Sequence, residues 1–329
     1  MPGASVSRAN TPPRKVVIGT ALVELSCPLA ERLQFAGQLV DDGARAATVK
    51  YPGVGLDLMI FPEFALATGT GTTAADQAVD LEGPVLDALG AKAREHKTWI
   101  IMPMTLREAD RISNAAVLID RAGNVAGIYR KTHPIADEHG VFEGGVTPGT
   151  SHPVFDCDFG RLGILICWDM SYDESWRSLA DAGAEIIAVP SASPQTLRPM
   201  SEALRHNVYV VTSTLKDNAS VFDPIGRVVA QVTNKPGVLV HQIDLSYAIL
   251  HWSETLQEGR VLTERFGDKV GYLYSSREDT GVFWSNDPEM NIGSMIRELG
   301  LREMLEQVEA MGKAVERFHE RTNAKKPGG

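Results

Sequence analysis

Three side chains that could act together as a nucleophile, a base and a positive charge stand at equivalent places in this sequence. Cys167, Glu63 and Lys131 each come directly after a short, largely apolar run of the kind that forms a buried strand. In an open α/β sheet, ligands bind at the carboxyl ends of the strands. A thiol can attack a carbonyl carbon, a carboxylate can take the thiol proton, and an ammonium can stabilise the oxyanion that forms. The three positions therefore predict a cysteine-dependent catalytic site.

Cys167 has the most informative local context of the three. It follows the apolar residues 162–166 and precedes Trp168, Asp169 and a polar stretch that is predicted to begin a helix. The positive end of a helix dipole favours a thiolate, which is the nucleophilic form of cysteine. We therefore expect a reactive thiol here, although a small core side chain would give the same local sequence.

The other two cysteines, Cys157 and Cys27, are less favoured as reactive residues. Cys157 lies between Asp156 and Asp158, whose negative charges disfavour a thiolate, and Cys27 has no motif nearby. Three cysteines in 329 residues argue against a disulfide framework and are typical of a reducing compartment. We therefore expect Cys157 to be structural and the protein to be cytoplasmic.

The base that Cys167 needs is not evident among the histidines. None of the eight stands in a context that marks it as a cysteine partner, and no group of His, Cys, Asp and Glu has the spacing of metal ligands. We therefore expect no metal and no cofactor. Glu63 or Lys131 alone could be a solvated charge at a strand end, but three coincident strand ends favour a catalytic arrangement.

The composition fits a globular protein and argues against several kinds of partner. Hydrophobic residues make up 43% of the chain, charged residues 22%, and the formal net charge is −10, which disfavours nonspecific binding to nucleic acid or anionic membranes. No stretch approaches the ~20 apolar residues of a membrane span. Residues 14–25 only loosely resemble a secretory signal, because Glu24 interrupts the apolar run and no cleavage site follows. We interpret residues 16–23 as the first strand and residues 1–13 as a flexible lead.

Residues 14–250 are predicted to form one α/β domain, because strands and helices alternate without a linker. Residues 251–329 form a C-terminal extension whose last third has the pattern of an amphipathic helix. The apolar residues of that helix are Leu301, Met304, Leu305, Val308, Met311, Val315 and Phe318. The favoured interpretation is that this face packs on its own body, and the alternative is that it covers a neighbouring subunit.

Several segments of the chain resemble the nitrilase, or carbon–nitrogen hydrolase, superfamily. The resemblance covers roughly residues 15–244. Its main motifs are Phe61-Pro-Glu63, Tyr129-Arg-Lys131, Arg161-Leu-Gly-Ile-Leu-Ile-Cys-Trp-Asp169 and Gly183-Ala-Glu-Ile-Ile-Ala-Val-Pro190. It implies a four-layer α-β-β-α sandwich, a Glu–Lys–Cys triad on Glu63, Lys131 and Cys167, and a homodimer or higher homo-oligomer.

Members of this family often have a second glutamate between the lysine and the cysteine. Glu138 lies seven residues after Lys131, with Phe142 four further on, as in the nitrilase branch. Glu143 lies five residues before Pro148, as in the amidase branch. We favour Glu138 and expect it to position the substrate and to hold Lys131 charged by pairing.

The resemblance favours the amidase-like branch, because Cys167-Trp-Asp169 and the pair Glu174 and Arg177 look more like amidases and carbamoylases than nitrilases. It implies hydrolysis of a small amide or N-carbamoyl compound through a cysteine thioester, with release of ammonia or an amine. Alternatives are a nitrilase that makes a carboxylic acid and a catalytically silent scaffold of the same fold. Departures from the family at Tyr172-Asp173 and at residues 201–207 leave the substrate open. The candidate residues for the pocket and the oxyanion site are Trp168, Tyr172, Ser191 and Ala192.

Overall fold

The structure is a computed structural model that describes residues 8–67, 71 and 73–324 of the chain. It divides into two compact units. The larger consists of Lys15–Ile243, and the smaller of the described residues of Val6–Arg14 and Asp244–Gly329. Each unit is described separately below.

The larger unit contains strands β1 to β13, helices α1 to α5 and a short 3-10 helix, η2. The strands are β1 (Lys15–Leu22), β2 (Leu58–Ile60), β3 (Val79–Asp80), β4 (Trp99–Arg107), β5 (Ile112–Ile119), β6 (Val125–Arg130), β7 (Val154–Cys157), β8 (Gly160–Ile164), β9 (Ile186–Ser191), β10 (Tyr209–Thr214), β11 (Ala219–Phe222), β12 (Val228–Val232) and β13 (Gly237–Asp244). The helices are α1 (Leu29–Lys50), α2 (Ala74–Gln77), α3 (Pro84–His96), η2 (Cys167–Ser171), α4 (Asp173–Asp181) and α5 (Leu197–His206).

The strands follow the order β6-β5-β4-β2-β1-β10-β9-β8-β7, with β3, β11, β12 and β13 attached to this path. Six consecutive strands of this order are parallel to one another, namely β4, β2, β1, β10, β9 and β8. The strands at either side of these six, β5 and β7, are antiparallel to their neighbours. β6 is antiparallel to β5 and therefore runs in the same direction as β4. The carboxyl ends of β2, β6, β8 and β9 consequently point the same way, which brings the residues that follow them to one edge.

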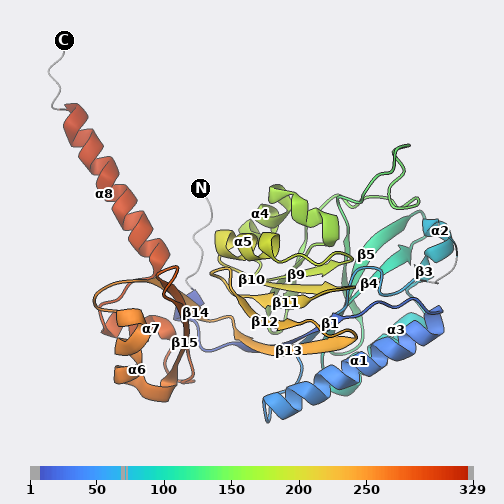
Figure 1. The fold of residues 1–329 in the computed structure, drawn as a ribbon, viewed down its shortest axis with the longest axis horizontal. Coiled ribbons are helices and arrows are strands. Elements are labelled where there is room, and N and C mark those ends of the chain that lie inside the picture. Colours follow the sequence, from blue (N-terminus) through green and yellow to red (C-terminus); the bar gives the residue numbers. More distant parts are fainter. Residues whose placement is uncertain (1–7, 68–70, 72, 325–329) are drawn as a thin grey trace. The chain divides into compact units, whose positions relative to one another are not determined.

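The two ends of this strand order approach each other. A Cβ atom at Gly127 in β6 would lie 2.3 Å from the ring of Phe155 in β7, so the ring packs directly against the glycine backbone. Helices α1 and α3 cover one side of the strands, and α4 and α5 lie on the opposite side (Figure 1). The larger unit is therefore the four-layer α-β-β-α arrangement that the sequence predicts.

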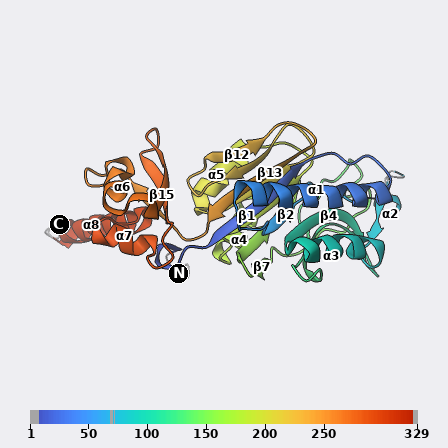
Figure 2. The same ribbon diagram turned by 90° about the horizontal axis from the view of Figure 1, so that it is seen from below.

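Helix α1 shows why the sequence folds in this way. Its buried positions recur at helical spacing and pack with β2 and α3 into one core cluster. Gly43 belongs to this face, because a Cβ atom there would come within 3.3 Å of Leu56. Figure 2 shows α1 and α3 lying beside each other on the same side of the strands.

The smaller unit contains a three-stranded antiparallel sheet in the order β14-β16-β15 with helices around it. Its elements are η1 (Arg8–Asn10), β14 (Tyr247–His251), η3 (Gln257–Gly259), α6 (Arg260–Phe266), η4 (Gly267–Lys269), β15 (Val270–Ser275), β16 (Thr280–Ser285), α7 (Ile292–Glu298) and α8 (Met304–Ala324). Phe283 is completely buried in the core of this unit, and the ring of Tyr272 stacks on it.

Part of the segment that we expected to be a flexible lead belongs to this smaller core. Ala9 is completely buried, and Thr11 and Arg14 are hydrogen bonded to Ser246. Residues 8–13 are therefore packed rather than a free lead, because the backbone of Ala9 lies directly against Gly293, where a Cβ atom would come within 2.9 Å of the Ala9 carbonyl oxygen. Residues 1–7 of the expected lead lie outside the described residues. The two compact units meet in the sequence at residues 243 and 244, and the domain bounds 14–250 stay a prediction.

A search of the helices among the described residues finds none with the length and apolar character that crossing a bilayer requires.

Candidate active site

Glu63 lies just beyond the end of β2 and is almost completely buried, with a side-chain exposure of 1%. Its Oε1 atom accepts hydrogen bonds from Lys131 Nζ at 2.8 Å and from Asn114 Nδ2 at 2.9 Å. Its Oε2 atom accepts one from the backbone N–H of Ala192 at 3.0 Å. These donors come from three different elements, so they fix the orientation of the carboxylate.

Lys131 directly follows β6 and is as deeply buried as Glu63. Its backbone N–H donates to the carbonyl of Asn114 at 2.9 Å, which continues the strand pairing by one residue. Its ammonium also donates to Glu143 Oε1 at 2.5 Å. Burial on its own would lower the pKa of Lys131, but the negative charges of Glu63 and Glu143 outweigh burial and raise it above its ordinary value. Lys131 is therefore positively charged at neutral pH.

The second glutamate beside Lys131 is Glu143 and not Glu138, so the structure differs here from our expectation. The side chain of Glu138 is 87% exposed and forms an ion pair with its neighbour His139 at 3.6 Å. The cause is a local turn, because the Asp137 carboxylate accepts from the backbone N–H groups of His139 and Val141 and folds this part of the loop toward solvent.

Glu143 is turned inward by its own backbone. Its φ is +40°, and Gly144 and Gly145 that follow it also have positive φ values. The two glycines adopt these angles without steric cost, which lets the chain reverse directly after Glu143. The carboxylate then also accepts from the backbone N–H of Ile135 at 3.1 Å.

Asn114 in β5 completes this cluster and was not anticipated from the sequence. Its Nδ2 donates to Glu63 at 2.9 Å and to Glu143 at 2.8 Å, so one amide group links the two carboxylates. The signal in the sequence was a buried polar pair, Ser113-Asn114, in an otherwise apolar strand. A buried polar side chain in such a strand needs partners, and these partners are the two charged groups.

Cys167 is the first residue of η2, and its backbone is strained. Its φ is +46°, an unfavourable value for a residue with a side chain. Burial, and next the negative charge of Glu63, raise the pKa of the thiol to about 11, while a hydrogen bond with Ser191 and the charge of Lys131 act in the opposite direction. Glu63 and Lys131 both act electrostatically on the thiol, which places them near Cys167.

The net shift in the pKa of the Cys167 thiol is upward, opposite to the direction expected from a helix N-terminus. The helix that begins at Cys167 is a 3-10 helix of five residues, too short to offset burial and the carboxylate. At neutral pH the thiol is protonated and needs a base. The expectation for Cys157 agrees with the structure, since burial and then Asp158 raise the pKa of its thiol to about 12.

Asp169 connects the cysteine turn to the lysine strand. It is completely buried, and Oδ2 accepts from the Tyr129 hydroxyl at 2.7 Å and from the backbone N–H of Ile166 at 2.9 Å. Oδ1 accepts from the Thr132 hydroxyl at 3.0 Å and from the backbone N–H of His133 at 2.8 Å. One carboxylate thus holds the residues on both sides of Lys131 against the turn that carries Cys167.

The four pocket residues predicted from the sequence lie in different environments. Ala192 contacts Glu63 through its backbone, and Ser191 influences the Cys167 thiol. Tyr172 stacks on His133 with ring centroids 3.6 Å apart, and Trp168 is 44% exposed. Ser191 and Ala192 therefore lie beside Cys167 and Glu63, whereas Tyr172 lies against the segment after Lys131.

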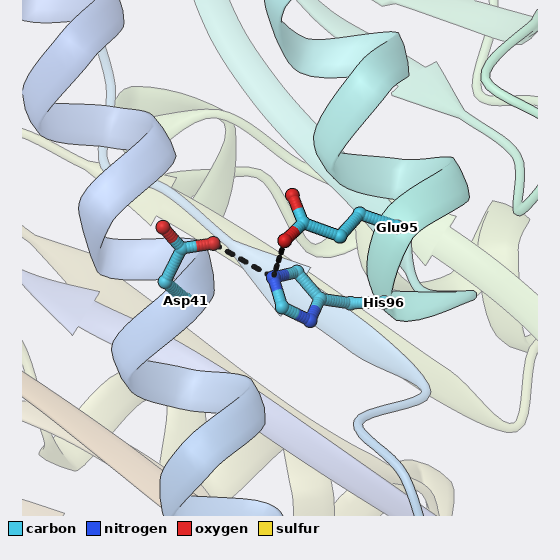
Figure 3. Close-up of side chains that lie close together, drawn as sticks. All are labelled: Asp41, Glu95 and His96. Atoms are coloured by element: carbon cyan, nitrogen blue, oxygen red, sulfur yellow. Dashed lines mark hydrogen bonds and ion pairs between the residues drawn. The ribbon is translucent and has the colours of Figure 1, made fainter.

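A second cluster of titratable side chains joins α1 to α3, and Figure 3 shows three of its members. His96 Nε2 lies 2.7 Å from Asp41 Oδ1 and 3.9 Å from Glu95 Oε1. These groups are close enough for a metal ion in principle. However, Lys92 Nζ donates to the same two carboxylates at 2.7 and 2.9 Å. An ammonium thus occupies the position of a cation, and the cluster is an ion-pair network between two helices.

Comparison with known proteins agrees with this architecture. A family model described as carbon–nitrogen hydrolase matches residues 21–250. The chain is 26% identical over 291 residues to human deaminated glutathione amidase, covering 75% of this chain and 85% of that protein. It is 34% identical over 171 residues to the "hydrolase in pqqF 5'region" of Pseudomonas protegens, covering 51% of this chain and 57% of that protein. The match to the mouse deaminated glutathione amidase spans 61% of that relative at 30% identity.

Solved structures share the fold at low sequence identity. Nit3 of Saccharomyces cerevisiae, described as a member of branch 10 of the nitrilase superfamily, has a TM-score of 0.58 at 20% identity, covering 71% of this chain and 90% of that chain. The NitFhit protein of C. elegans has a TM-score of 0.61 at 21% identity, covering 72% and 62%.

Proposed function

The chain belongs to the carbon–nitrogen hydrolase family, and we propose that it is a cysteine-dependent, amidase-type hydrolase of small molecules. The observation that carries this proposal is the buried network of Glu63, Lys131 and Glu143 beside the protonated thiol of Cys167. Two carboxylates and one ammonium are held away from water next to a nucleophile. Such a preorganised charge arrangement can stabilise a transition state at little cost in reorganisation.

In the proposed first step, Glu63 acts as the general base. It takes the proton from Cys167 Sγ while the sulfur forms a bond to the carbonyl carbon of the amide. The electron pair of the C=O bond moves to oxygen, and the positive charge of Lys131 stabilises the resulting oxyanion. The raised pKa of Cys167 gives the physical reason why a base is required.

In the second step the C–N bond breaks. Glu63 gives its proton to the leaving nitrogen, which departs as ammonia or an amine and leaves a thioester on Cys167. Water then gives one proton to Glu63 and attacks the thioester carbon. When the C–S bond breaks, the sulfur recovers that proton and the carboxylic acid is released.

Glu143 and Asn114 act as positioning residues in this proposal. Glu143 accepts from Lys131 and keeps its ammonium charged and in place. Asn114 donates to both carboxylates and offsets their mutual repulsion. Neither residue exchanges protons with the substrate.

The proposal is supported by relatives named as amidases and as nitrilases. Their names leave open which carbon–nitrogen bond this chain cleaves. A panel of small amides, N-carbamoyl compounds and nitriles, assayed by ammonia or amine release, distinguishes the amidase from the nitrilase alternative. Turnover of nitriles alone would contradict the amidase assignment.

The central test is covalent trapping. Incubation with a slowly hydrolysed amide or ester should add one acyl group to Cys167, identified by mass spectrometry of the digested protein. Cys167→Ala should abolish the adduct and the turnover, whereas the matched control Cys157→Ala should retain both. An adduct on Cys27 or Cys157, or near-normal turnover by a folded Cys167→Ala variant, would refute the proposal, as would a catalytically silent wild type whose Cys167 does not react with iodoacetamide.

A further inference from the structure

Helix α8 of the smaller unit carries an apolar face that is open to solvent. Five large side chains on it are at least half exposed, and the values run from 55% for Val315 to 68% for Met311. These residues are Leu305, Val308, Met311, Val315 and Phe318. Figure 1 shows α8 as a straight helix that extends away from the other elements of its own unit. An exposed helix of 21 residues gains little stability by itself, because most helical stability comes from burying an apolar face.

The spacing of this face is that of a coiled coil. From Met304 onward, apolar residues follow at steps of four, three, four and three, ending at Phe318. This is the a/d pattern of a heptad repeat, which forms the narrow seam of a coiled coil. A helix that lies on a globular body usually shows a broader stripe at a 3.6-residue period. The pattern therefore favours another helix as the partner.

The charges on α8 indicate the orientation of that partner. The first half, together with the residues just before it, has one arginine and three glutamates, at positions 302, 303, 306 and 309. The second half has three basic and two acidic residues, at positions 313, 316, 317, 320 and 321. Two copies placed side by side in parallel would bring acidic half against acidic half. An antiparallel pair places each acidic half beside a basic half.

We propose that α8 associates with α8 of a second copy of this chain in an antiparallel two-stranded coiled coil. The two-fold axis of this pair would pass between residues 309 and 310 of each helix. Each a position of one helix then lies opposite a d position of the other. This arrangement brings Val308 opposite Met311 of the second copy, and Met304 opposite Val315 of the second copy. The interface is self-complementary and closed, so it produces a pair and not a filament.

A membrane surface fits this helix less well. Membrane-bound amphipathic helices usually carry a polar face that is rich in lysine and arginine. The polar face of α8 alternates acidic and basic residues, with Glu309 and Lys313 paired one turn apart. Such a face is not attracted to anionic lipid.

The first test measures mass by sedimentation of the full chain at micromolar concentrations. The double variant Val308→Glu with Val315→Glu, called the stripe variant below, places two charges in the apolar face of α8. It should weaken association by about 10²-fold or more. Its mass should be half that of the wild type. The control variant Ala310→Glu places the same residue type on the opposite face, leaves the basic residues of the second half in place, and should keep the wild-type mass. Circular dichroism and hydrolase activity should be unchanged in both.

A wild type with the same mass as the stripe variant would overturn the proposal. So would loss of association in the control variant. A monomeric wild type that floats with phosphatidylserine vesicles, and loses this property in the stripe variant, would overturn it by assigning the stripe to a membrane.

The second test determines the orientation by disulfide cross-linking and keeps most of the seam intact. In the antiparallel pair, a mixture of Met304→Cys and Val315→Cys proteins should cross-link, because these positions face each other. Met304→Cys alone should not, since its two copies would lie about 16 Å apart along the axis. A rapid cross-link in Met304→Cys alone would show a parallel pair and contradict the antiparallel arrangement.

Discussion

Two clusters in the larger unit have almost the same chemical composition but different settings. One joins Lys131 to Glu63 and Glu143, and the other joins Lys92 to Asp41 and Glu95. The nitrogen–oxygen distances are 2.8 and 2.5 Å in the first cluster and 2.7 and 2.9 Å in the second. Contact geometry alone therefore does not separate the buried cluster around Lys131 from a surface ion-pair network.

Burial is what separates them. The Lys131 side chain is 2% exposed and the Lys92 side chain 26%, while Glu95 is more than half exposed. Water screens the surface cluster and can replace any of its partners, so each contact there contributes little. In the buried cluster no water competes, so each group determines the charge state of the others and of the nearby Cys167 thiol.

The largest effect should follow from removal of the buried ammonium. Lys131→Met keeps the length of the side chain but leaves Glu63 and Glu143 facing each other without a positive charge. We expect a loss of turnover of at least about 10³-fold and a loss of stability of about 3–5 kcal/mol. Steady-state kinetics and urea unfolding measure the two. Turnover within tenfold of wild type would show that the charge at residue 131 is not required.

The next effect distinguishes the two candidate glutamates. Glu143→Gln should lower kcat by about 10²-fold, because the neutral amide holds Lys131 less firmly and leaves its charge less compensated. The matched change Glu138→Gln lies in the exposed turn and should alter kcat less than twofold. The reverse order of these two effects would restore Glu138 as the second glutamate.

Asn114→Ala should have a smaller effect than loss of either charge. The two carboxylates would lose their shared donor and with it the contact that positions both beside Lys131. We expect kcat to fall by about tenfold while KM changes little. Steady-state kinetics measure both constants, and urea unfolding checks that the variant is folded. A rise in KM with unchanged kcat would contradict a positioning role for Asn114.

The raised pKa of Cys167 predicts a change of stability with alkaline pH. The folded protein holds the thiol proton more tightly than the unfolded chain does, so the stabilising contribution is complete below pH 9. It is lost as the pH rises from about 9 to about 11. Over this range the wild type should lose on the order of 1–2 kcal/mol more stability than Cys167→Ala. Parallel urea-unfolding profiles of the two proteins would contradict this prediction.

The smallest effect should come from the surface cluster. Lys92→Met removes the same charge as Lys131→Met but from a site that water reaches. We expect a loss of stability below about 1 kcal/mol, reduced further by salt, and no change in turnover. A destabilisation comparable to that of Lys131→Met would mean that burial does not explain the contrast between the clusters.

The sequence predicts an α/β domain and the three strand-end residues because these depend on local patterns, while the four-layer arrangement is what the family resemblance implies. Apolar runs identify the strands, and the polar residue after each run identifies Glu63, Lys131 and Cys167. The parallel direction of β2 and β8 then brings their ends to one edge. Short-range pattern and sheet topology together account for this part of the site.

Other features depend on contacts that local sequence does not encode. The choice between Glu138 and Glu143 is decided by a turn around Asp137 and by positive φ angles at residues 143–145. Asn114 acquires its role from partners 29 and 51 residues away. The direction of the Cys167 pKa shift depends on the burial of its side chain and on the charge of Glu63, which the dipole argument omitted.

Asp169 and Glu143 together have a consequence for protein engineering. At the start of the loop after Lys131, Thr132 and the backbone of His133 donate hydrogen bonds to Asp169. At the far end of the loop, Glu143 accepts a hydrogen bond from Lys131. Residues 135–142 between these two contacts are exposed, and both ends of this stretch are therefore held in place by hydrogen bonds. Because the entropy of closing a loop grows only slowly with its length, a peptide tag inserted after His139 should leave the catalytic groups in register.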